Sequence, residues 1–248
     1  MNMDPTTSEP PEPPRSFWSR WVGIYFSPGE TFGDIARKPG FAAPLIVSII
    51  SGLAFTEAML FKIGMERIVR NAIEQSGRAG QLSAEQIDQA AQQAATIGMV
   101  MAHLGVMIGP PMFLAIVAAL GLAFVNGFYG GKLDFIRSFS VACYTNLIHV
   151  LGVFMAMFII FFGDPDRFNP NNPMPTNPGF FLNPLETSKP LLVFAGSLDL
   201  FSFWFIALLG IGYSAASGGK VKAFSISALF FGCWLVFVLL RVGLALIL

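Results

Sequence analysis

The sequence predicts an all-α membrane protein: a polytopic helix bundle with five transmembrane helices, N-terminal interfacial helices and an extramembrane helical hairpin. Two observations predict this class. Five apolar stretches are each long enough to cross a bilayer, which takes about 20 apolar residues. The composition is 54% hydrophobic and only 12% charged, whereas soluble domains are about a quarter charged. The 15 basic and 15 acidic residues balance, so no global basic field for nucleic acid is expected.

The first 40 residues are expected to lie outside the bilayer core. Residues 1–14 form a proline-rich, acidic tail that is predicted to be disordered. A cleavable signal peptide is not expected, because a signal has a basic start followed by an apolar run. Residues 15–40 mix arginines with aromatic residues and are predicted to form an interfacial amphipathic segment in the headgroup layer. The predicted membrane-surface contacts are Arg15, Trp18, Arg20, Trp21, Arg37 and Lys38.

A short helix is expected in the second half of this segment. Ser27 can cap it, and Pro28 suits its first helical position. Pro39 should end it. Its apolar face, which includes Phe32 and Ile35, predicts that this helix also lies on the membrane. For the residues that precede it, the alternative is a small helix packed under the bundle.

Residues 41–248 are predicted to form the membrane domain. Its five spans are expected at about residues 41–64, 98–126, 138–163, 191–216 and 223–248. Pro110 and Pro111 should kink the second span. Residues 164–190 are rich in proline and asparagine, which predicts an extended surface loop.

Residues 65–97, between the first two spans, are predicted to form a helical hairpin that stands out of the membrane. Glu66 and Arg70 have the i,i+4 spacing of a helical ion pair. Ser83 followed by Gln86 has the pattern of a capping box. A helix should therefore begin near Ser83 and run into the second span.

Basic residues near the span ends predict the orientation, because cytoplasmic loops carry an excess of lysine and arginine. The N-terminal face would carry Arg15, Arg20, Arg37, Lys38, Lys132, Arg137, Lys220 and Lys222. The opposite face would carry Arg67, Arg70, Arg78, Arg167 and Lys189. The excess favours a cytoplasmic N-terminus, and five spans then put the C-terminus outside.

Four ionisable residues are predicted to lie at a similar depth within the spans: Glu57, Asp199, Arg241 and His103. Charges within a membrane are costly and usually face a bundle interior. We therefore hypothesise that Arg241 pairs with Asp199, Glu57 or both. Two interpretations stay open, a structural clasp between spans and an ion or proton pathway.

No catalytic chemistry is predicted. The chain lacks a His-Glu-x-x-His zinc motif, a phosphate-binding loop and a Gly-x-Ser-x-Gly nucleophile motif. The two cysteines, Cys143 and Cys233, stand singly in apolar stretches and are interpreted as packing residues. No cofactor and no metal site are expected.

Two motifs stand out, one around the start of the membrane domain and one in its predicted fourth span. The first reads Tyr25-Phe26-Ser27-Pro28-Gly29-Glu30-Thr31-Phe32, then Ile35-Ala36-Arg37-Lys38-Pro39 and Pro44. The second reads Ser197-Leu198-Asp199-Leu200-Phe201-Ser202-Phe203-Trp204, then Leu208-Leu209-Gly210-Ile211-Gly212. Together they resemble the bacterial branch of the Ypt-interacting-protein (Yip) family. The resemblance implies five membrane helices, a cytosolic N-terminus and a far-side C-terminus. The resemblance implies no catalytic residues. The family's eukaryotic relatives are associated with Rab-type GTPases and vesicle traffic.

The function predicted from these features is that of a non-enzymatic membrane adaptor or organiser, linked to membrane organisation or trafficking-like processes. It would act through the N-terminal segment and the loops on the same face. The alternative is a small-solute or ion transporter or channel that uses Glu57, Asp199 and Arg241. Expected partners are the lipid bilayer, an unknown membrane or cytosolic protein and a second copy of the chain. The expected location is a bacterial cytoplasmic membrane.

Overall fold

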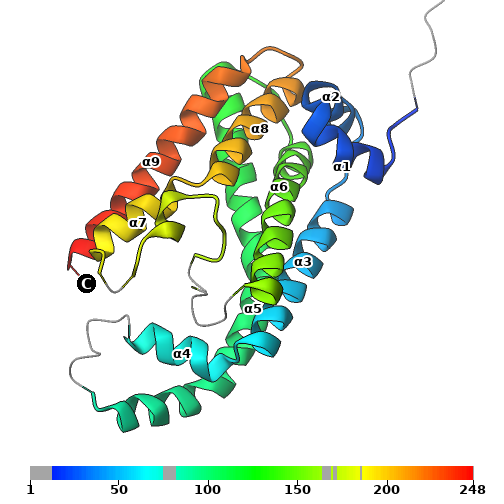
Figure 1. Ribbon diagram of the computed structural model, residues 1–248. Coiled ribbons are helices and arrows are strands. Elements are labelled where there is room, and N and C mark those ends of the chain that lie inside the picture. Colours follow the sequence, from blue (N-terminus) through cyan, green and yellow to red (C-terminus); the bar gives the residue numbers. More distant parts are fainter. Residues whose placement is uncertain (1–12, 75–81, 164–168, 170–171, 185, 248) are drawn as a thin grey trace, which may run out of the picture.

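The computed structural model describes residues 13–74, 82–163, 169, 172–184 and 186–247. All regular secondary structure in these residues is helical (Figure 1). The predicted all-α class is therefore confirmed. The tail at residues 1–12 lies outside the described residues, so its predicted disorder stays a prediction.

Four helices of the described chain are long and apolar enough to cross a membrane. They are α3 (Ala42–Lys62), α5 (Ala84–Ala123), α6 (Phe135–Phe162) and α9 (Ala223–Ile247). α5 runs through Pro110 and Pro111 without a break and continues as a π-helix, η2 (Phe124–Phe128). These helices correspond to the predicted first, second, third and fifth spans.

The fourth predicted span is broken rather than continuous. It consists of α7 (Lys189–Ser197) and α8 (Leu200–Ala216), which meet at an angle of 44°. Counted as one span, this pair brings the total to five. The break falls at Leu198 and Asp199, where α7 ends and the Asp199 side chain caps α8.

The predicted hairpin is helical over residues 65–74 and from Ala84 onward. α4 (Met65–Glu74) packs against the first part of α5. Ser83 and Gln86 form the predicted capping box. Arg70 Nη2 lies 2.9 Å from Asp88 Oδ1 and 3.8 Å from Glu66 Oε1. Figure 1 shows this hairpin at one end of the molecule and the short helices α1 (Phe17–Phe26) and α2 (Pro28–Arg37) at the other.

The core surrounds α6, which contacts α3, α5 and α8. Leu147 and Ile148 of α6 are fully buried, as is Tyr213 of α8. The Tyr213 ring packs directly on Gly121 of α5, where a side chain would collide with it. Cys143 is buried in this core as expected, whereas Cys233 is exposed on α9.

Candidate functional site

Asp199 lies at the break between α7 and α8. Its Oδ1 accepts a hydrogen bond of 3.0 Å from the backbone N–H of Ser202, which makes Asp199 the N-cap of α8. Its Oδ2 accepts a hydrogen bond from the Thr176 hydroxyl. The backbone N–H of Leu200 donates to the Thr176 carbonyl at 3.0 Å. Neutral donors therefore satisfy this buried carboxylate.

Two asparagines hold the loop that reaches Asp199. Asn172 and Asn177 exchange amide hydrogen bonds of 2.9 and 2.8 Å. Asn177 also caps the short 3-10 helix η3 (Pro178–Phe181). Gly179 approaches α7 so closely that a Cβ there would lie 2.6 Å from the Gly196 nitrogen. The described part of the predicted surface loop is therefore packed against the bent span.

Glu57 of α3 pairs with His103 of α5. The distance between Glu57 Oε1 and His103 Nε2 is 2.7 Å, and His103 Nδ1 lies 2.7 Å from the Met99 carbonyl oxygen. The side chains of Glu57 and His103 are 65% and 38% exposed. This pair therefore lies on the outer surface of the helices and not in the bundle interior.

Arg241 pairs with neither of these carboxylates in the part of the chain that the structure describes. Within the described part of the chain it forms no ion pair, and its guanidinium carbon lies 5.7 Å from the centroid of the Phe237 ring. It lines a cavity of about 410 Å³ together with residues that include Lys189 and Gly196 of α7. The hypothesised pairing of Arg241 with Asp199 or Glu57 is wrong, because similar depth along three helices does not place their side chains on facing sides.

The four ionisable residues that were predicted as a set therefore do not form one connected group. Only Glu57 and His103 contact each other. Among the described residues, no group of three or more histidine, cysteine, aspartate and glutamate side chains is placed to hold a metal ion. The arrangement is that of local structural contacts rather than a chain of charged groups leading across the bundle.

Replacing Asp199 by alanine is expected to destabilise the protein by about 2 kcal/mol, because an N-cap and a hydrogen bond to a buried charge are lost together. Asp199→Asn should cost less than about 1 kcal/mol, since asparagine caps helices nearly as well. Equilibrium unfolding of the purified protein in mixed micelles measures both values. Equal losses for the two variants would mean that the charge, and not the cap, is the important property.

The short helices α1 and α2 form a second polar centre, which the sequence analysis did not identify. We refer to α1 and α2 together as the docked cap. Arg20 of α1 is only 6% exposed, and Asp34 of α2 only 2%. Arg20 Nε donates to Asp34 Oδ2 at 2.8 Å, and Arg20 Nη2 donates to the Lys38 carbonyl at 3.1 Å. The backbone N–H of Arg15 donates to the same carboxylate oxygen at 3.3 Å.

Arg20 stays charged in this site. Burial opposes the charged form, but the contacts with Tyr144 and Asp34 outweigh it and raise the pKa of the guanidinium above its ordinary value. A buried ion pair needs such additional hydrogen bonds to offset its desolvation. Arg20 and Asp34 therefore fix how α1 and α2 lie against each other.

The docked cap packs against the helix bundle through buried apolar side chains. Phe32 and Ile35 of α2 are fully buried, and α2 contacts α8 and α6. A Cβ on Gly212 of α8 would lie 3.1 Å from Phe32 Cδ1, so this glycine makes room for the ring. On α1, the Tyr25 hydroxyl donates to the Leu147 carbonyl of α6 at 3.0 Å. The expectation that the apolar face of α2 lies on the membrane is wrong, since that face is covered by protein.

The predicted membrane-surface residues are therefore divided as well. Arg20 is buried, and its prediction as a surface contact is wrong. Arg15 pairs with Glu30 at 2.7 Å, and Trp21 donates to the Tyr25 hydroxyl at 2.9 Å. Trp18, Arg37 and Lys38 are exposed. Asp34 was missed, although a lone acid between the apolar residues Phe32 and Ile35 is the signal that could have indicated it.

One edge of the docked cap remains uncovered. Trp18, Val22 and Phe26 lie at i, i+4 and i+8 on α1, and they are 66%, 57% and 84% exposed. Residues at this spacing share one face of a helix. We call these three residues the cap edge. It is an apolar ridge beside the ends of the spans.

Fold and contacts together define a polytopic helical membrane protein that carries a short helical cap packed on one end of its bundle. A comparison with protein families specifies this class further. The family model of the Yip1 domain matches residues 22–241, and the chain belongs to this family. No curated protein and no solved structure matches the chain.

The matched range contains both motifs on which the resemblance was based. The first motif forms the end of α1 and all of α2, and the second forms the end of α7 and most of α8. They meet where Phe32 packs on Gly212. Docking of the cap therefore gives a physical reason for the pairing of these two motifs in one chain.

Proposed function

We propose that this protein is a non-enzymatic integral membrane adaptor that presents the docked cap to a protein partner. The cap edge is the observation that carries the proposal. Its three large apolar side chains stand on a helix that an ion pair and an apolar face hold rigidly on the bundle. A preorganised apolar ridge loses little conformational entropy on binding, and exposed aromatic residues are typical anchors of protein interfaces.

The proposed location is a bacterial cytoplasmic membrane with the docked cap on the cytoplasmic side. This orientation is supported by lysine and arginine residues in three places: the docked cap, the connection before α6, and the connection between α8 and α9. Figure 1 shows these three parts at the same end of the molecule, and α9 runs away from that end. A cytosolic or membrane protein is therefore the partner that could reach the cap edge.

Transport is not proposed. That alternative depended on Glu57, Asp199 and Arg241 acting as one connected set, and each of these residues lies in a different set of contacts.

Photo-cross-linking in native membranes tests the adaptor. A photoreactive amino acid replaces Trp18 or Phe26 of the cap edge, and, as the matched control, Leu240 of α9, which is 63% exposed. We expect both cap positions to capture the same protein and Leu240 not to capture it. Introducing Arg20→Leu should abolish this capture, because the cap edge is then no longer held in place. Adducts with lipid alone at the cap positions, or the same protein at Leu240, would contradict the proposal.

A further inference from the structure

A pocket beside the docked cap gathers four basic side chains from separate segments. Its volume is about 380 Å³, within the range of about 300–1,000 Å³ typical of small-ligand sites. Arg37 comes from the end of α2, and Arg137 from the first turn of α6. Lys132 precedes α6, and Lys220 lies between α8 and α9. We call these four residues the basic pocket.

The two lysines stand on similar turns. Each follows a pair of glycines, Gly130-Gly131 and Gly218-Gly219. Gly130, Gly218 and Gly219 have positive φ angles of 62°, 68° and 75°, which only glycine adopts readily. The chain therefore reverses tightly before each lysine.

Both turns are held by side-chain hydrogen bonds. Asn126 exchanges hydrogen bonds of 2.9 and 2.8 Å with the backbone of Leu133. The Ser217 hydroxyl donates to the Ser214 carbonyl at 2.7 Å and accepts from the Val221 N–H at 3.3 Å. The backbone positions of Lys132 and Lys220 are therefore defined on both sides of the pocket.

The charges of the basic pocket are only partly neutralised. Arg137 Nε lies 3.2 Å from Asp134 Oδ2, and Arg37 Nη2 lies 3.4 Å from Asp34 Oδ1. Asp34 already binds Arg20 more closely, at 2.8 Å. Across the residues that the structure describes, no carboxylate pairs with Lys132 or Lys220. The pocket therefore carries a net positive charge and offers ammonium and guanidinium donors to an anion.

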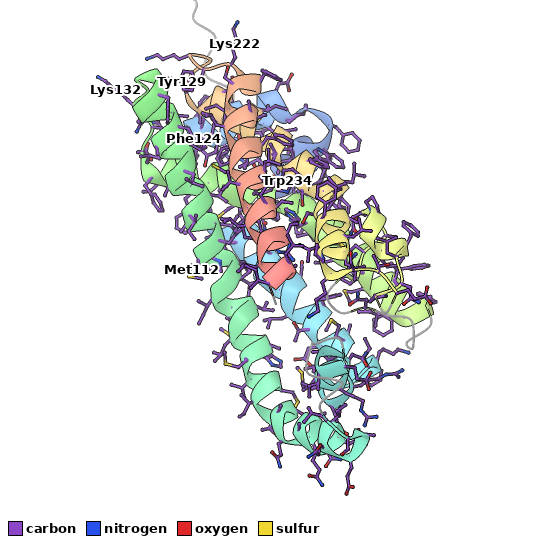
Figure 2. All side chains as sticks on the ribbon, turned by 90° about the vertical axis from the view of Figure 1, so that its left-hand side faces the viewer. Met112, Phe124, Tyr129, Lys132, Lys222 and Trp234 are labelled. Carbon is purple, nitrogen blue, oxygen red and sulfur yellow. The ribbon has the colours of Figure 1, made fainter. Side chains whose placement is uncertain are left out.

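The depth of the pocket indicates the source of the anion. It lies where α6 and α9 begin and α8 ends, which is the headgroup level if these helices span the bilayer. Figure 2 shows Lys132 at this end of the molecule, near Tyr129 and Lys222, while Met112 lies midway along α5. Lysine and arginine at this level attract anionic headgroups.

We propose that the basic pocket binds a phosphate group, and that its depth favours the phosphodiester of an anionic phospholipid headgroup. Arg37 and Arg137 can each offer two N–H donors to phosphate oxygens, and Lys132 and Lys220 add the charges that have no carboxylate. The bound group would join α2, α6 and the α8–α9 connection.

Native mass spectrometry of the full chain, released from nanodiscs with and without phosphatidylglycerol, tests this site. The pocket variant is Lys132→Gln with Lys220→Gln. The control variant, Lys38→Gln with Lys222→Gln, removes the same charge from exposed lysines that do not line the pocket. We expect the pocket variant to retain about 30-fold less phosphatidylglycerol. The control variant should lose much less, because its lysines do not converge on one bound group. Lys132→Arg with Lys220→Arg should preserve retention.

A second arm adds inorganic phosphate to protein in phosphate-free detergent and measures thermal stabilisation. The pocket variant alone could lose this stabilisation while it retains as much phosphatidylglycerol as the unmodified protein. That result would support the site and identify a free phosphate as its ligand. Equal losses in the pocket and control variants would show attraction by diffuse surface charge and overturn the proposal. Failure of the unmodified protein to bind either probe would also overturn it.

Discussion

Arg20→Leu is expected to destabilise the protein by about 3 kcal/mol, because it leaves Asp34 buried without its closest cation. Asp34 is only 2% exposed, so water cannot replace the lost guanidinium. Arg37 stays 3.4 Å from Asp34 Oδ1, which places the expected loss at the lower end of the range for broken buried pairs. Equilibrium unfolding in mixed micelles measures the loss.

Two controls separate the buried pair from general loss of charge. Arg15→Leu removes an arginine whose partner, Glu30, has a 72% exposed side chain, so it should cost at most about 1 kcal/mol. The double variant Arg20→Leu with Asp34→Leu should be more stable than Arg20→Leu alone, since no uncompensated buried charge remains. This account of the docked cap would be contradicted if the double variant were less stable than Arg20→Leu. It would also be contradicted if Arg15→Leu cost as much stability as Arg20→Leu.

Gly210→Leu is the second substitution with a large expected effect, again about 3 kcal/mol. Gly210 of α8 faces the start of α9. A Cβ there would lie 2.6 Å from the Ala223 carbonyl oxygen and would also overlap the Ser227 hydroxyl. The carbonyl belongs to the backbone of a neighbouring helix, so the two helices must separate to admit a side chain.

Gly232→Leu in α9 is the matched control for Gly210→Leu. No neighbouring heavy atom lies within 4 Å of a Cβ at Gly232. This control should leave the free energy of unfolding nearly unchanged, because leucine also favours helix more than glycine does. Equilibrium unfolding of both variants in mixed micelles measures the difference. Equal losses of stability in Gly210→Leu and Gly232→Leu would contradict the close contact between α8 and α9.

The sequence predicted the membrane helices well because hydropathy and length are local properties. The helices α3, α6 and α9 begin and end within a few residues of the predicted limits. The Ser83–Gln86 capping box formed as predicted, since its hydrogen bonds join residues three positions apart. The two motifs were sufficient to indicate the family, which the match over residues 22–241 shows.

The polar contacts were less predictable because they depend on residues far apart in the chain. Asp199 resembles an intramembrane charge in sequence, but Thr176 and Ser202 turn it into a helix cap. The apolar face of α2 suits a membrane as well as a protein surface, and only tertiary structure shows that α8 covers it. For the same reason, Arg20 could not be distinguished in sequence from an arginine at a lipid headgroup.

The central claim, that the cap is docked on the bundle, is tested most directly by a distance between spin labels in lipid nanodiscs. One label replaces Ser19 of α1 and the other Lys222, both exposed. Exposed Cys233 is changed to serine, and buried Cys143 is kept. Pulsed electron paramagnetic resonance should give one narrow distance distribution that broadens in Arg20→Leu. A broad distribution in the otherwise unmodified protein would show a cap that moves freely on the membrane, and would contradict the account.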